Sequence, residues 1–300
     1  LWNASRFCEM NGVKPVQGFD PSTVQSPLGR WIIFEASKAI SEATSALEAY
    51  RFDEYAGSCY RFVWNRFCDW YLELTKPLFS GDTTPEAEEL RAVTAWVLET
   101  ILRLLQPIMP FVTDTLWHEF CYGPRGELMG ASWPVPVTVP GAEAAVEEID
   151  WLTRFISEIR TVRSEMNVPP SRLSPVLLKE ASATTQDRAT RWKGTIGRMA
   201  RVSEIGVLDG DVPKGSAQAV LDEATLVLPL ADIIDLDAER ARLTKELDKA
   251  EGEIEKTERK LGNADFIARG KPEVVEETRE RLVTQQGDRD RLKAALARLG

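Results

Sequence analysis

The stretch YRFVWNRFCDWYLE, residues Tyr60 to Glu73, decides how this chain folds. It places six aromatic residues among two arginines, an asparagine and two carboxylates. The apolar positions recur in steps of three and four, which is the spacing of one face of a helix. The pattern predicts a helix that Asp53 caps and that Pro77 and Gly81 end, with a core-facing stripe that includes Tyr60, Val63, Phe67 and Trp70.

Helical spacing continues on both sides of this stretch. Ser26 followed by a proline predicts the start of a helix over residues 27–50. The sequence from Thr83 to Glu86 resembles a capping box and predicts a third long helix, which prolines end. Residues 111–120 form a short amphipathic segment. The fold class is therefore mainly α, with an antiparallel helical bundle over residues 1–125.

A different pattern follows the bundle. Prolines and glycines become frequent, which predicts a linker over residues 126–145. Residues 146–231 then combine a helix, short apolar runs typical of strands and a basic helix near residues 184–200, which predicts a small α/β subdomain. The runs expected as strands are Val176–Leu178, Ile205–Leu208 and Thr225–Leu230.

The last part of the chain, residues 232–300, predicts an antiparallel coiled-coil hairpin. A 3-4 apolar rhythm runs from Leu236 to Leu261, stops at Gly270-Lys271-Pro272 and then resumes. At 1.5 Å per residue, such a hairpin would project roughly 40 Å. From Ala238 to Leu299 it carries 15 Lys+Arg against 14 Asp+Glu, so it is nearly neutral in a chain of net charge -10.

Composition excludes several classes of protein. With 43% hydrophobic residues, the 300-residue chain is not disordered in bulk, and it lacks the run of about 18 apolar residues that a membrane span needs. The net negative charge argues against a uniformly basic nucleic-acid coat but permits a local basic stripe. Four widely spaced cysteines predict reduced, buried thiols and a cytoplasmic location. The first residue is Leu1, without a signal peptide, which suggests a piece of a longer protein.

The motifs of catalysis are missing from the sequence. The single histidine, His118, has Thr115 where a Glu-x-x-His metal motif needs glutamate. We find no G-x-G-x-x-G, P-loop or G-x-S-x-G motif and no Cys/His set for zinc. We therefore expect no catalytic residue, metal or cofactor within this chain.

Six motifs follow one another along nearly the whole chain: LWNASRF (1–7), EAYRFDEYA (48–56), FVWNRFCDWYLELTKP (62–77), LLQPIMPFVTDTLW (104–117), SEMNVPPS (164–171) and LPLADIIDLDAERARLTKEL (228–247). Together and in this order they resemble the C-terminal part of bacterial valyl-tRNA synthetases, a class I aminoacyl-tRNA synthetase family. The bundle motifs are shared with isoleucyl and leucyl enzymes, whose corresponding region remains an alternative, whereas the terminal hairpin favours the valyl family.

The resemblance implies that catalysis and tRNA recognition belong to different parts of the complete enzyme. The catalytic and editing domains, with ATP and Mg²⁺, would lie before Leu1, and the complete enzyme would attach valine to tRNA(Val). This chain would be its tRNA-recognition portion, inactive alone, monomeric, and without a DNA or membrane partner. The alternative from another class is a coiled-coil interaction or oligomerisation module.

The resemblance also implies where tRNA is bound. The anticodon would meet the start of the bundle, with Trp31 stacking on a base and Arg30 donating hydrogen bonds, unless Trp31 is a core residue of its helix; the candidates are Asn3, Arg6, Lys14, Arg30 and Trp31. The hairpin would dock near the tRNA elbow through phosphate contacts, unless its charges serve only solubility. The candidates there are Lys245, Lys249, Lys256, Arg259, Lys260, Arg269 and Lys271.

Overall fold

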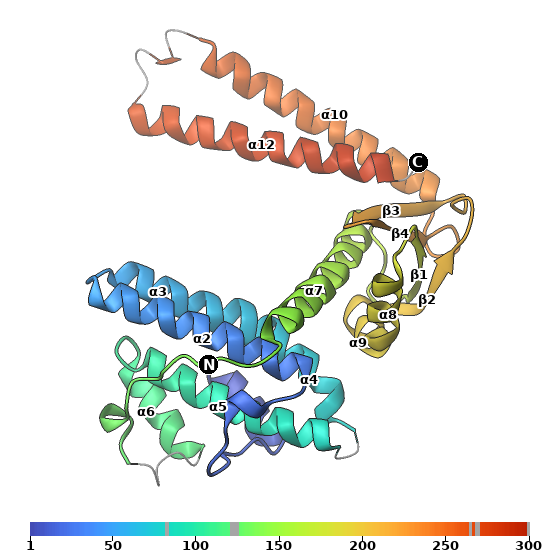
Figure 1. Ribbon diagram of the computed structural model, residues 1–300. Helices are drawn as coiled ribbons and strands as arrows, with labels where there is room; N and C mark the ends of the chain where they lie inside the picture. The colour runs from blue at the N-terminus through green and yellow to red at the C-terminus, as the bar shows by residue number, and fades with distance from the viewer. Residues whose placement is uncertain (82–83, 121–125, 264–265, 268–270, 299–300) are drawn as a thin grey trace. The chain divides into compact units, whose positions relative to one another are not determined.

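The chain forms two compact units, Leu1–Thr153 and Arg154–Gly300, each described here by itself (Figure 1). The structure is a computed structural model that describes residues 1–81, 84–120, 126–263, 266–267 and 271–298. Helices predominate in both units, as the sequence predicts. The division differs from the predicted four parts, because the residues expected as a linker fold onto the first unit.

The first unit is a bundle of helices. The long helices α2 and α5 pack on each other and on the segment that follows α2. The short helix α1 was not predicted from the sequence. The elements are α1 (Trp2–Met10), η1 (Pro21–Thr23), α2 (Pro27–Glu48), α3 (Phe52–Tyr60), η2 (Arg61–Tyr71), α4 (Leu72–Phe79), α5 (Pro85–Leu105), α6 (Pro110–Glu119), η4 (Leu128–Gly130) and the start of α7 (Ala142–Glu165).

The helix starts follow the expected chemistry with two corrections. Pro27 opens α2 directly after Ser26, as predicted. Helix α5 is capped by Thr84, whose hydroxyl accepts a hydrogen bond from the Ala87 amide at 3.1 Å, whereas the predicted capping residue Thr83 lies outside the described residues. Asp53 lies in the first turn of α3, where its charge suits the helix dipole, and Arg51 occupies the N-cap position.

The aromatic stretch differs from the prediction in its winding. Residues Arg61–Tyr71 form a π-helix, whose i→i+5 hydrogen bonds place more residues in each turn than an α-helix does. The buried stripe therefore moves to Phe62, Val63, Phe67 and Tyr71. Tyr60, predicted in the core, is 61% exposed instead.

The core of the first unit includes two buried tyrosines whose hydroxyl groups are hydrogen-bonded. The Tyr71 hydroxyl lies 2.9 Å from Thr94 Oγ1 and 3.3 Å from the Leu90 carbonyl oxygen. The Tyr55 hydroxyl donates to the Leu104 carbonyl oxygen. These bonds tie the α3–η2–α4 segment to α5.

The residues predicted as a linker pack against α2. The Trp133 indole N–H donates to Thr44 Oγ1 at 2.8 Å. Ser37 Oγ both donates to the Val137 carbonyl oxygen at 3.0 Å and accepts from the Val137 amide at 2.9 Å. An extended segment with its backbone groups bonded in this way is part of the bundle rather than a free connection.

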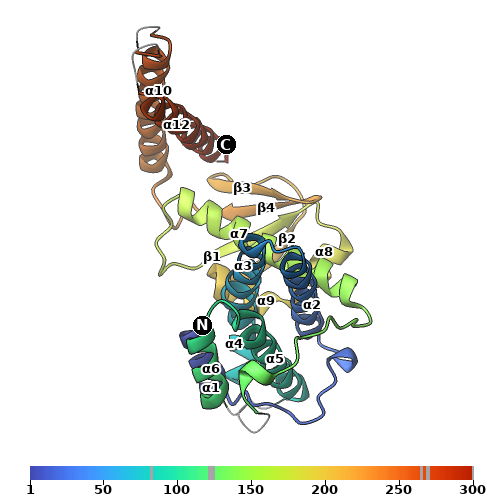
Figure 2. The same cartoon turned by 90° about the vertical axis from the view of Figure 1, so that its left-hand side faces the viewer.

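The second unit holds a four-stranded sheet of order β2-β1-β4-β3 (Figure 2). β1 pairs with β2 in parallel, and the other pairs are antiparallel. Three strands were predicted, and β3, whose alternating alanines give a weak hydrophobic signal, was missed. The basic helix expected near 184–200 is two helices. The elements are β1 (Ser174–Lys179), α8 (Ala183–Arg191), α9 (Lys193–Ala200), β2 (Val202–Leu208), β3 (Ser216–Leu221) and β4 (Ala224–Pro229).

The predicted hairpin is present as two antiparallel helices, α10 (Leu236–Leu261) and α12 (Pro272–Arg298) (Figures 1 and 2). Asp235 caps α10 by accepting from the Ala238 amide at 3.0 Å. Lys293 of α12 forms an ion pair with Glu251 of α10 at 2.8 Å. Among the described residues of the hairpin, few apolar side chains are buried, and Leu243, Ile254 and Ala295 are three of them.

The cysteines agree with the prediction where the structure describes them. Cys8 and Cys59 are buried, and Cys68 is half-buried. Burial raises the pKa of Cys8 to about 12 and that of Cys59 to about 11, which keeps both thiols protonated and unreactive. Cys121 lies outside the described residues.

Replacing Tyr71 with phenylalanine tests the buried hydrogen bonds between η2 and α5. Tyr71→Phe removes the hydroxyl that contacts Thr94 and Leu90, and we expect the free energy of unfolding to fall by about 1 kcal/mol. Urea denaturation measures this change. Tyr50→Phe is the matched control because Tyr50 is 81% exposed. Equal stability of the two variants would contradict the assignment.

Glu223, in the β3–β4 turn, provides a pH-dependent test. Hydrogen bonds from Ser182 and Thr185 hold its pKa at about 2, below the ordinary value of 4.5. A lowered folded-state pKa stabilises the fold above the unfolded-state pKa, and this contribution disappears as the pH falls toward 2. We therefore expect Glu223→Gln to lower the Tm at pH 7 and to lower it progressively less below about pH 4.5.

Thermal unfolding at several pH values checks this expectation. Glu204→Gln, which changes an exposed glutamate of β2, is the control for loss of one negative charge. A Tm difference between wild type and Glu223→Gln that stays constant down to pH 3 would contradict the role given to these hydrogen bonds.

Candidate nucleic-acid interface

Three of the predicted anticodon-binding residues lie exposed near the start of the chain. Asn3 and Arg6 are one turn apart on α1, and Lys14 follows the helix. Arg6 lies 3.4 Å from Glu9 in an exposed ion pair, which contributes little stability and leaves the guanidinium accessible. The backbone after α1 is fixed by Arg91, whose Nε donates to the Asn11 carbonyl oxygen at 2.9 Å. These side chains can meet a polyanion.

The other two predicted residues behave differently. Arg30 is half-buried and donates to the Val24 carbonyl oxygen at 2.8 Å and to Gln25 Oε1 at 2.7 Å, so it braces the segment before α2. Trp31 has an exposed fraction of 0%. It is a core residue of α2, and the predicted stacking of a base on Trp31 does not fit this structure.

A cavity that the sequence did not predict lies beside Lys14. It has a volume of about 400 Å³ and is lined by residues 15–19 together with Ala92, Trp96 and Glu99. Phe19 and Trp96 are half-buried there. Aromatic side chains can stack on an unpaired base. The Glu99 carboxylate in the cavity wall is bonded to Arg103. The sequence feature that could have pointed to this cavity is an aromatic residue, Phe19, directly after a glycine in an irregular segment.

The aromatic stretch also presents an exposed pair. Tyr60 and Trp64 stack with ring centroids 6.3 Å apart, and Trp64 is 51% exposed. Arg66, in the same stretch, forms an ion pair with Glu35 of α2 at 3.3 Å. Glu35 is 8% exposed, and its pKa is raised by burial, with the Arg66 charge acting in the opposite sense.

The predicted cations of α10 lie on one face of the helix. At about 100° per residue, five of them fall within about 100° of arc around the axis. Leu243 and Ile254, which are buried in the hairpin, lie on the opposite side. The same arc holds Arg242 and Gly252 but no carboxylate, although α10 is rich in glutamate. We call the five residues the basic stripe: Lys245, Lys249, Lys256, Arg259 and Lys260.

All five residues of the basic stripe are exposed. Arg259 pairs with Glu255 at 2.6 Å, and Lys260 Nζ lies 4.6 Å from the Phe266 ring centroid. Lys271, also predicted, is exposed immediately before α12. Arg269 lies outside the described residues. The sequence contained the signal for this stripe, because helical spacing alone puts these cations on one face.

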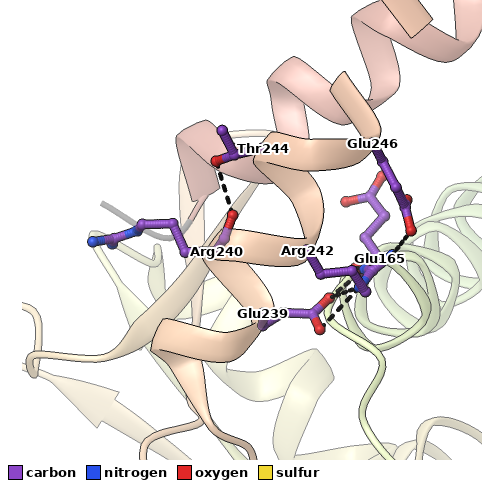
Figure 3. A network of polar contacts seen from close by, with 6 residues as sticks. All are labelled: Glu165, Glu239, Arg240, Arg242, Thr244 and Glu246. Atoms are coloured by element: carbon purple, nitrogen blue, oxygen red, sulfur yellow. Dashed lines mark hydrogen bonds and ion pairs between the residues drawn. The ribbon is translucent and has the colours of Figure 1, made fainter. Parts of the chain in front are cut away.

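The base of the hairpin is held by a network centred on Arg242 (Figure 3). Arg242 bonds Glu239 and Glu246 on its own helix and donates to the Glu165 carbonyl oxygen at 3.1 Å. The hydrogen bond to Glu239 raises the pKa of Arg242 despite partial burial. Arg298 of α12 pairs with the Glu165 carboxylate. Both helices of the hairpin are therefore tied to the last residue of α7.

Among the residues that the structure describes, one group of side chains with metal-ligand chemistry lies close together. His118 Nε2 lies 3.2 Å from Glu127 and 3.9 Å from Asp114, all with exposed side chains. Exposed side chains of this kind form ordinary surface ion pairs, and nothing else at the site points to a metal. No helix in the described part of the chain is both long and apolar enough to cross a membrane.

Sequence comparison gives a family for both parts of this interface. Residues 29–178 match the family described as the anticodon-binding domain of tRNA ligase. Residues 235–300, which include the basic stripe, match the valyl tRNA synthetase tRNA binding arm. The second match favours the valyl family over the isoleucyl and leucyl alternatives and over an unrelated coiled-coil module.

Bacterial valine–tRNA ligases match the chain from end to end. The protein of Granulibacter bethesdensis is 62% identical over 300 residues, which is 100% of this chain and 34% of that relative. The proteins of Gluconobacter oxydans and Caulobacter vibrioides are 58% and 50% identical, again over 100% of this chain and 33% of each relative. The chain thus spans about a third of the length of these curated relatives. It belongs to the valyl-tRNA synthetase family, with an anticodon-binding domain followed by a tRNA-binding arm.

Proposed function

We propose that this chain is the part of a valine–tRNA ligase that binds tRNA(Val). The basic stripe of α10 carries the proposal, because an exposed row of cations without carboxylates suits a phosphate backbone. The complete protein would attach valine to tRNA(Val) in the cytoplasm. ATP, Mg²⁺ and the catalytic residues would be supplied by the remainder of that protein, and the chain alone would not aminoacylate.

The arm would contact the phosphate backbone of the tRNA without recognising its base sequence. Lysine ammonium groups on flexible stems act as mobile point charges, so they can follow a phosphate backbone without fixed geometry. Double-stranded RNA offers proteins mainly its shape, phosphates and 2′-hydroxyls. The tie to Glu165 at the base keeps the stripe in a defined place within the second unit. The hairpin is closed within one chain, which fits a monomer.

The bundle would supply contacts to the anticodon loop. Asn3, Arg6 and Lys14 offer exposed donors, and the cavity with Phe19 and Trp96, whose lining begins at the residue after Lys14, offers aromatic faces. Single-stranded bases are recognised by this combination of stacking and hydrogen bonding. Arg30 would act by bracing the segment before α2, since its guanidinium is already bonded there.

Removing charge from the basic stripe tests the arm. We expect the quadruple variant Lys245→Gln, Lys249→Gln, Lys256→Gln and Lys260→Gln to bind tRNA(Val) more weakly and to reduce the slope of log K against log salt by up to about 3 to 4, because each lost phosphate contact accounts for about 0.9. Binding titrations at several salt concentrations measure both quantities.

A matched variant separates this effect from net charge. Arg279→Gln, Arg281→Gln, Arg289→Gln and Arg291→Gln remove the same number of cations from α12. An equal loss of affinity and slope in both variants would mean that total charge, and not the basic stripe, drives binding.

Truncated tRNA tests the bundle contacts. We expect Arg6→Gln with Lys14→Gln to weaken binding of intact tRNA(Val) about tenfold or more, because hydrogen bonds to charged groups are worth about 1.5–3 kcal/mol. The same double variant should bind a transcript lacking the anticodon stem-loop as wild type does. Arg51→Gln with Arg61→Gln is the control of equal charge in the same unit. Equal weakening with both transcripts would rule out anticodon contacts at Arg6 and Lys14.

A further inference from the structure

A second concentration of positive charge lies in the second unit, away from the basic stripe in the sequence. Arg160 and Arg163 of α7 and Arg201, at the end of α9, line a cavity of about 480 Å³. The rest of its wall comes from Ser164, from the turn at residues 167–170 and from Met199 and Ala200. Three guanidinium-bearing side chains at one cavity, drawn from segments up to 41 residues apart, need an explanation.

Arg163 is the unusual member of this group. It is 6% exposed, and its guanidinium donates to Ser174 Oγ at 2.8 Å and to the carbonyl oxygens of Arg172 at 2.7 Å and Pro169 at 3.3 Å. All of these acceptors are uncharged, and no carboxylate of the described residues lies within ion-pair distance of Arg163. Burying a cation without a counter-charge is costly. Burial and the nearby Arg201 charge lower the pKa of Arg163 accordingly.

The backbone holds Arg201 at the cavity. Its φ of 58° is in the left-handed region, which costs a non-glycine residue free energy. The position is fixed because the Arg201 carbonyl oxygen accepts from the Ser174 amide at 3.1 Å, where β1 begins. The Arg201 side chain is exposed and forms no ion pair among the described residues. It is therefore available to an anion.

Arg160 and the turn complete the lining. The Arg160 Nε donates to the Met199 carbonyl oxygen at 2.9 Å, which fixes the guanidinium beside the cavity. Ser164 and Asn167, both exposed, also line it and add uncharged donors. Asn167 has a φ of 50°, so the turn is held in a conformation that brings its side chain to the same wall.

We propose that this cavity binds a phosphate group. Guanidinium groups present planar pairs of N–H donors that match phosphate oxygens, and a phosphate would supply the counter-charge that Arg163 lacks. The shared chemistry fits two sources: a phosphate of an RNA backbone, or a free phosphate or nucleotide. The proposal does not rest on the proposed function, because it concerns a different cavity and can be tested without RNA.

Titration with inorganic phosphate tests the proposal on the 300-residue chain. We expect phosphate to raise the Tm of the wild type above the value in sodium acetate at equal ionic strength, and to give a saturable change in the ³¹P NMR line width. Arg201→Gln should weaken phosphate binding about tenfold or more, because it removes hydrogen bonds to a charged group. Arg201→Lys keeps the charge but loses the planar donors. Its affinity for phosphate should lie between those of the wild type and Arg201→Gln.

Arg198→Gln is the matched control. It removes one exposed cation from α9, three residues from Arg201, and Arg198 does not line the cavity. We expect this variant to bind phosphate as the wild type does. Similar Tm values of all variants without phosphate would show that Arg201→Gln has not damaged the fold. If Arg201→Gln does lower the Tm without phosphate, Arg160→Gln replaces it as the test variant.

Binding of tRNA distinguishes the two sources of the phosphate. If the group belongs to an RNA backbone, Arg201→Gln should weaken tRNA binding relative to Arg198→Gln and reduce the salt slope by about 0.9. If the group is free, tRNA affinity should be equal in the two variants while their phosphate affinities differ. Phosphate binding that is no stronger than acetate binding, or that is equal in Arg201→Gln and Arg198→Gln, would overturn the proposal.

Discussion

The packing of α10 against α12 is the constraint on which the proposed interface depends. Leu243 and Ile254 must be buried against the partner helix, and this fixes the rotation of α10 about its axis. With that rotation set, every residue of the basic stripe faces solvent, and the glutamates of α10 lie toward the flanks. A chain of net charge -10 thereby presents a carboxylate-free row of cations. Local arrangement, and not overall charge, decides which surface suits a polyanion.

A helical hairpin with few buried apolar side chains needs support at its base. Exposed ion pairs along its helices contribute little each, so they cannot set its direction. The network around Glu165 is different, because Arg242 reaches the backbone oxygen and Arg298 reaches the carboxylate of the same residue. Arg242 is only a third exposed and bonds three groups at once. These bonds fix the base of the hairpin within the second unit and thereby the position at which the basic stripe begins.

Periodicity in the sequence predicted most helices, the hairpin and three of the four strands, because each depends on local spacing of apolar residues. It failed where the winding changed. The π-helix at Arg61–Tyr71 lengthened the repeat, so Tyr60 left the predicted core and Phe62 and Tyr71 entered it. Among the proposed tRNA contacts, the stripe could be predicted because its residues share one helix. The helical spacing left the burial of Trp31 open as one of two alternatives, and the structure decides for it. The cavity at Phe19 could not be predicted, since it depends on contacts between distant segments.

The two cationic surfaces of the second unit illustrate different uses of positive charge. The stripe consists mainly of lysines on one exposed helix face, which suits phosphates whose positions vary. The cavity uses arginines, one of them almost fully buried and held by neutral acceptors at a strand start and a turn. A guanidinium fixed in this way cannot follow a moving backbone, but it can select an anion of defined size and geometry. Lysine at Arg163 could not make the same three bonds in one plane, so this position requires arginine for the fold as well as for the anion.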